Sequence, residues 1–122
     1  MKKIEILALV FAGVFFFPTF AGAAFIEGLE DIPLAPGLTQ VQNDNISFGN
    51  EESRLVEVSL TSAKIGFAKV EKFYKDTLPQ MGWIYQGKRD NILTFYREGE
   101  VIDIVRESVK PLSVRITVKS KL

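Results

Sequence analysis

The stretch SAKIGFAKVEKFYKDTLPQMGW, residues Ser62 to Trp83, decides how the rest of the chain can fold. Its apolar residues recur at steps of three and four, the period of an amphipathic α-helix with one buried side. Pro79 disfavours helical geometry at the residue before it, and Gly82 can adopt the left-handed conformation that ends a last turn. We therefore predict one helix, with its N-cap at Thr61 or Ser62 and its end near Pro79, followed by a strand. The apolar stripe consists of Ala63, Phe67, Val70, Phe73, Tyr74, Thr77, Leu78 and Met81.

Alternating apolar and polar residues stand on both sides of this helix and predict an antiparallel sheet. The clearest alternation runs from Leu112 to Lys119, where every second residue is apolar. The links after the helix are short and polar, which suits antiparallel neighbours. We read 87–91 and 98–99 as turns between these strands. The predicted strands are residues 46–48, 55–61, 83–86, 92–97, 101–107 and 112–119.

One helix packed on such a sheet gives an α+β fold with two layers. We expect an antiparallel sheet of about five to six short strands, in the chain order β-β-α-β-β-β-β, covered on one face by the helix. The alternative for the apolar side of the helix is that it docks into another protein. The other, wet face of the sheet should carry Glu57, Ser59, Thr94, Asp103, Arg115, Thr117 and Lys119.

The first 23 residues have the pattern of a secretory signal peptide. Two lysines follow the first Met, residues 6–17 form an uncharged apolar run, and Ala21 and Ala23 are small residues at the positions that signal peptidase reads. A run of this length is shorter than the roughly 20 residues that span a bilayer. We expect cleavage near Ala23 and a mature chain in the bacterial periplasm or outside the cell. The alternative is an uncleaved segment that serves as a membrane anchor.

The mature chain divides by pattern into an arm and a domain. Residues 24–45 have neither helical nor alternating periodicity, and Pro33, Pro36 and Gly37 interrupt them. We expect residues 24–45 to form an extended arm that lies across an α+β domain of residues 46–122. The alternative is that the arm is a strap that binds a partner.

The amino-acid composition restricts the catalytic and metal-binding chemistry that the chain can carry out. The chain contains no His and no Cys, which removes the commonest general base, the thiol nucleophile and the usual zinc and copper ligands. Its 15 Lys and Arg balance 15 Asp and Glu, so no basic surface for nucleic acid is indicated. We therefore expect no catalytic residues, no cofactor and no metal, and we do not expect an enzyme. Carboxylate chemistry at Asp103, Glu51 and Glu52 is the enzymatic alternative.

Two functions agree with this composition. The first is a non-catalytic periplasmic or envelope binding module that contacts a protein partner through a sheet edge, the arm or the wet face. The alternative is a carrier of a small apolar ligand, with a groove between helix and sheet. The aromatic residues around Trp83 form either a core or an exposed platform. The expected binding surface comprises Ile32, Leu34, Trp83, Tyr85 and Asp103.

Two phrases of the sequence resemble a known group of proteins. The phrases are EDIPLAPGL, residues Glu30 to Leu38, and FYKDTLPQMGW, residues Phe73 to Trp83. The chain thereby resembles small exported proteins of unknown function from alphaproteobacteria, which share a signal peptide, an ED-x-P-L-x-x-G-L arm and an F-Y-x-x-x-L-P-x-x-G-W helix end. The resemblance covers most of the mature chain. It implies a location in the cell envelope and the same α+β layout, and it implies no activity, ligand or catalytic residue.

Overall fold

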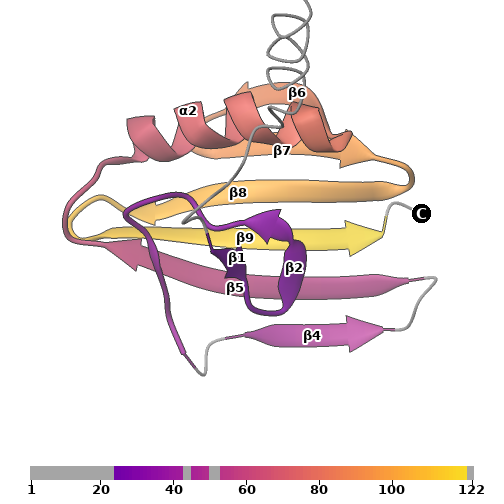
Figure 1. Cartoon of the computed structure of the whole chain (residues 1–122), viewed down its shortest axis with the longest axis horizontal. Coiled ribbons are helices and arrows are strands. Elements are labelled where there is room, and N and C mark those ends of the chain that lie inside the picture. Colours follow the sequence, from indigo (N-terminus) through magenta and orange to yellow (C-terminus); the bar gives the residue numbers. More distant parts are fainter. Residues whose placement is uncertain (1–23, 43–44, 50–52, 121–122) are drawn as a thin grey trace, which may run out of the picture.

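The computed structural model describes residues 24–42, 45–49 and 53–120, so the predicted signal peptide of residues 1–23 lies outside the described part of the chain. The described residues form a seven-stranded antiparallel sheet, a two-stranded hairpin and one α-helix (Figure 1). This confirms the expected α+β class. The elements are β1 (Phe25–Ile26), β2 (Leu29–Pro33), β3 (Thr39–Gln40), β4 (Ile46–Gly49), β5 (Arg54–Ser62), α2 (Phe67–Thr77), the 3-10 helix η1 (Leu78–Met81), β6 (Ile84–Arg89), β7 (Ile92–Arg97), β8 (Glu100–Ser108) and β9 (Leu112–Ser120).

The large sheet has the strand order β3-β5-β9-β8-β7-β6, and β4 also pairs with β5. Its seventh strand, which the sequence pattern did not predict, is β3 from the arm, and it pairs with Leu60 and Thr61. Strand β6 is also longer than expected, because Gly87 does not begin a turn. Gly87 has a φ of 115° and lies at an irregularity in the pairing with β7, after which pairing continues to Arg89. A glycine inside a strand often marks such a bulge.

The helix begins four residues later than its apolar pattern indicated. Ser62 is not its N-cap, because residues 63–66 are not helical, although the Ser62 hydroxyl accepts hydrogen bonds from the backbone N–H groups of Lys64 (2.9 Å) and Ile65 (3.2 Å) as a capping side chain would. Those bonds satisfy two backbone N–H groups of the loop before the helix, and the N-cap is Gly66. The predicted end is confirmed. Pro79 stands in η1, and Gly82 has a φ of 95° in the left-handed region.

Residues 24–42 of the expected arm pack against the rest of the described chain, and they form strands β1, β2 and β3. Residues 25–33 form the β1–β2 hairpin, and Tyr74 of α2 holds the chain that follows. The buried Tyr74 hydroxyl donates to the carbonyl of Pro33 (2.7 Å) and accepts from the N–H of Ala35 (3.1 Å). Burial raises the pKa of this hydroxyl well above its ordinary value, so it remains a donor. The arm adds Ile26, Leu29, Ile32, Ala35 and Leu38 to the core.

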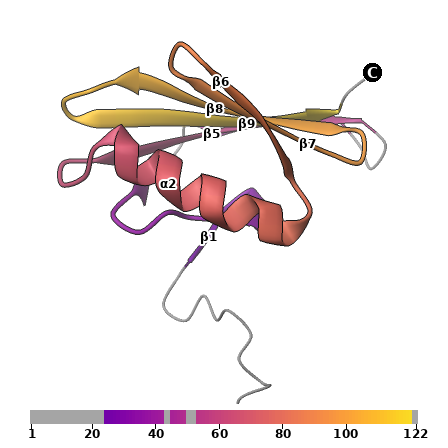
Figure 2. The same ribbon diagram turned by 90° about the horizontal axis from the view of Figure 1, so that it is seen from above.

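The core lies on one side of the large sheet. Figure 2 shows α2 and the arm on the same side, with the opposite side of the sheet free of both. Side chains alternate accordingly: in β9 every second residue from Leu112 to Val118 is buried, and those between are half-buried. We call the side that faces α2 the closed face and the other side the open face. Trp83 (1% exposed) and Phe95 (0%) are among the largest side chains of the closed-face core.

Candidate binding surface

The open face carries the seven residues that the alternation placed there. Six of them are half-buried and Lys119 is exposed. Three form part of one cross-strand series, in which Glu57 lies opposite Thr117 and Thr117 lies opposite Asp103. The Thr94 hydroxyl donates to the Asp103 carboxylate (2.8 Å) on the next strand. This central part of the open face is therefore polar.

A different series of residues crosses the open face at one end of the strands. Each member lies opposite the next in the pairing of adjacent strands, and five of the six are apolar or aromatic. Strands are about 4.8 Å apart, so six neighbouring strands place the first and last members roughly 24 Å from each other. We call this series the apolar row; it runs Phe48, Leu55, Lys119, Val101, Tyr96 and Ile84.

Among the apolar and aromatic members of the row, exposure is greatest at the two ends. Phe48 on β4 is 62% exposed and Ile84 on β6 is 63% exposed. Between them, Leu55 and Tyr96 are half-buried and Val101 is 9% exposed. Val101 is buried although it does not belong to the closed-face core, so its neighbours on the open face shield it. The row thus has two exposed apolar ends, joined by the half-buried Leu55 and Tyr96 and the buried Val101, with Lys119 among them.

The one charge in the apolar row is Lys119. Its side chain is exposed, and it takes part in none of the ion pairs found among the described residues. Arg115, which lies four residues earlier on the same face of β9, is instead paired with Glu107. Lys119 therefore offers a positive charge in the middle of an apolar strip.

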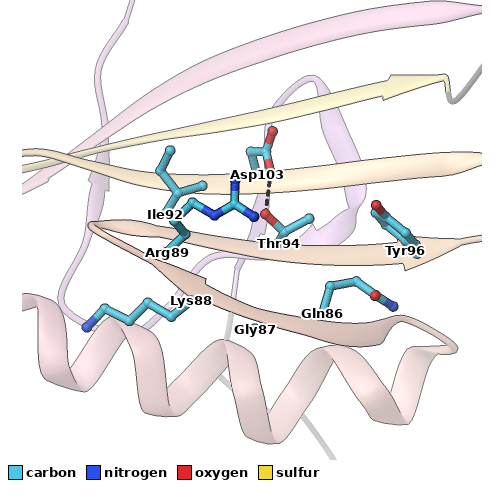
Figure 3. A pocket seen from close by; sticks show the side chains of 8 residues that line it. All are labelled: Gln86, Gly87, Lys88, Arg89, Ile92, Thr94, Tyr96 and Asp103. Atoms are coloured by element: carbon cyan, nitrogen blue, oxygen red, sulfur yellow. Dashed lines mark hydrogen bonds between the residues drawn. The ribbon is translucent and has the colours of Figure 1, made fainter.

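A polar hollow of about 480 Å³ adjoins the apolar row at Tyr96. Figure 3 shows Arg89 lying across it toward Thr94, with Asp103 behind and Tyr96 at the far end. Arg89 is exposed, and no described residue is paired with its guanidinium. The adjacent Lys88 points to the other side, where it donates to Glu71 of α2 (3.1 Å). The hollow is lined by Gln86, Gly87, Lys88, Arg89, Ile92, Thr94, Tyr96 and Asp103.

The densest charged cluster lies elsewhere and is structural. Arg97 donates to Asp31 (2.9 Å) and to the carbonyl of Met81 (3.1 Å), and Arg54 donates to Glu100 (2.6 Å). The hydrogen bond to Glu100 is the main cause that raises the pKa of the Arg54 guanidinium. Arg97 also lies over the buried Trp83 ring, 4.2 Å from its centroid. These groups satisfy one another and attach the arm to the sheet.

The structure separates the five residues expected to form a binding surface. Ile32 (0% exposed) and Trp83 (1%) are in the core, so placing them at the surface was wrong. Their apolar side chains face the arm–helix–sheet interior, which the pattern of the sequence alone does not distinguish from an exposed platform. Leu34 is half-buried against the core. Tyr85 is on the closed face beside Phe95, with ring centroids 5.2 Å apart. Asp103 alone lies on the open face.

The sequence pattern did not single out Phe48 and Ile84 of the apolar row, and it indicated Tyr96 only as one of the aromatic residues around Trp83. They lie far apart in the chain, and only the pairing register of β4 to β9 brings them onto one row. The single signal in the sequence is that each is apolar at a position out of phase with the buried residues of its strand.

The described residues do not support a metal site, a membrane-spanning helix or an apolar-ligand groove. No group of three or more acidic side chains there converges on a point that could hold a metal ion. No helix in those ranges is both long and apolar enough to cross a membrane. Glu51 and Glu52, the other candidate carboxylates, lie outside the described residues. Between helix and sheet, Phe67 and Tyr74 (7% and 0% exposed) belong to the core, so the apolar-carrier hypothesis gains no support there.

Comparisons with known proteins add no family assignment: the chain matches no protein-family model, no curated protein and no solved structure.

Proposed function

We propose that this protein is a non-catalytic binding module that acts through protein–protein contacts, with the open face of its sheet as the docking surface. The observation that carries the proposal is the apolar row, with Phe48 (62% exposed) and Ile84 (63%) at its ends. Single exposed apolar residues are ordinary on protein surfaces. Here five apolar or aromatic residues are aligned across six adjacent strands instead of being scattered, and clustered exposed apolar residues mark interaction sites.

A partner that covers the open face would remove the Phe48 and Ile84 side chains from water, which favours binding. Full burial of an Ile or Phe side chain is worth about 1.5–3 kcal/mol. Two such residues at the ends of the row give a partner two anchors, and the half-buried residues between them supply complementary area. Interfaces draw most of their energy from a few anchors of this kind.

The residues of the open face also indicate which side chains the surface of the partner should carry. Its contacting surface should be apolar along the row and should place a carboxylate near Lys119, which has no ion pair among the described residues. The polar hollow beside Tyr96 suits a hydrogen-bonding side chain at the rim of the contact. Polar rims around apolar centres are typical of protein interfaces. In this proposal α2 covers the opposite face as structural support.

The proposed location is the bacterial envelope. Residues 1–23 carry the signal-peptide pattern, and cleavage near Ala23 would release the mature chain into the periplasm or outside the cell. The proposed partner is therefore an exported or membrane-anchored protein.

Site-specific photo-crosslinking in the native envelope tests this proposal. A photoreactive residue at Ile84 should capture one protein reproducibly. The matched control is Lys72, an exposed residue of α2 on the opposite side of the sheet, where the side chain is 78% exposed. Capture of the same proteins at both positions, or of none at Ile84, would contradict the open face as the docking surface.

A further inference from the structure

The two edges of the large sheet differ in how they are protected. The β6 edge carries Lys88 and Arg89 and a pairing irregularity at Gly87, all of which discourage the addition of another strand. Strand β4 has neither a charged residue nor a pairing irregularity. Its residues, Ile46–Gly49, are uncharged and exposed, and its pairing with β5 is regular.

The outer edge of β4 is unpaired among residues 24–42, 45–49 and 53–120. Figure 1 shows β4 as the outermost strand, with no element beyond it. An unpaired, regular and uncharged edge exposes backbone N–H and C=O groups in the geometry that another strand needs.

The side chains of β4 match a second copy of themselves. In an antiparallel pair centred on Ser47, Ser47 lies opposite Ser47 of the second copy, and Ile46 lies opposite Phe48 twice. Ile46 (43% exposed) and Phe48 (62%) project from the open face. The pairing therefore forms two cross-strand apolar pairs on that face and opposes no like charges.

We infer that β4 pairs with β4 of a second copy of this chain, across a two-fold axis at Ser47, so that the sheet continues from one subunit into the other. Two-fold contacts of this kind are self-complementary, as the Ile46–Phe48 pairs are. The outer surfaces of these side chains stay open, so the apolar rows of the two subunits become continuous. The inference stands apart from the proposed function, since β4 pairing requires no other protein.

A single introduced cysteine tests the inference, because the chain contains none. Directly opposed residues of an antiparallel pair have Cα atoms about 4.5–5.5 Å apart, within the range for a disulfide. In Ser47→Cys, expressed as the full chain and purified from the envelope fraction, mild oxidation should give mainly a covalent dimer. The control Gln86→Cys places an exposed thiol on the β6 edge and should stay mainly monomeric.

Sedimentation velocity of the unmodified chain gives the second readout. The wild type should shift from monomer to dimer mass as concentration rises, and Ser47→Lys should stay monomeric because two lysines would oppose each other at the axis. A wild type that stays monomeric throughout, or a Ser47→Cys chain that crosslinks no faster than Gln86→Cys, would overturn the inference. Disulfide capture of a different protein at position 47 would overturn it in favour of a foreign strand. Capture at Ile84 is unaffected by either result, so the two proposals fail separately.

Discussion

The closed and open faces of the sheet are built from the same strands and differ in every second residue. On the closed face, Val58, Ile104 and Ile116 are fully buried. One position along each strand, Glu57, Asp103 and Thr117 lie on the open face and are half-exposed. The closed face is covered by α2 and the arm, whereas the open face has a polar centre and one apolar row. Alternation along each strand therefore identifies which face is covered, while the pairing register between strands determines which residues are adjacent on the uncovered face.

Trp83 and Ile84 provide the sharpest test of that comparison, because they are adjacent in sequence and belong to different faces. Trp83 is 1% exposed in the core and Ile84 is 63% exposed. Trp83→Ala should lower the free energy of unfolding by about 3–5 kcal/mol, the usual cost of removing a buried aromatic ring. Ile84→Ala should change it by less than about 0.5 kcal/mol. Denaturant unfolding measures both, and equal losses at the two positions would break the distinction between the faces.

The attachment of the arm gives a prediction of intermediate size. Tyr74→Phe removes the hydroxyl that donates to Pro33 and accepts from Ala35, leaving two buried backbone groups unsatisfied. Unfolding free energy should fall by about 1–3 kcal/mol. The control is Tyr85→Phe, a half-buried tyrosine, where less than about 0.5 kcal/mol is expected. If both variants lose the same amount, the arm is not held by Tyr74.

Much of the fold was predictable, because local patterns decide it. The alternation of residues 112–119 and the Pro79–Gly82 helix end follow from backbone geometry, and both are present in the structure. The helix start was not predictable from periodicity, since Ser62 makes the hydrogen bonds of a capping residue and yet the chain becomes helical only after Gly66. The hairpin and β3 of the arm were missed because the hairpin contacts α2 and β3 pairs with β5, and both of these elements lie far along the chain.

The candidate site was less predictable than the fold. Aromatic and apolar residues such as Trp83 and Ile32 suit a core and a binding surface equally well, and only tertiary burial distinguishes the two. Phe48 and Ile84 are 36 positions apart in sequence numbering, and they join one row only through the pairing of every strand between them. A pattern read along the chain does not contain that register.

The central claim is that the open face binds a partner through the apolar row. Its most direct test is the amount of partner that the tagged chain retains from the native envelope when Ile84 is replaced by Asp. Since Ile84→Asp removes the burial of a side chain that is 63% exposed in the free protein and adds the cost of desolvating a carboxylate, we predict at least a roughly tenfold loss of partner. Lys72→Ala on α2 should retain the wild-type amount, and both variants should unfold at the wild-type denaturant concentration. Undiminished retention by folded Ile84→Asp would contradict the account.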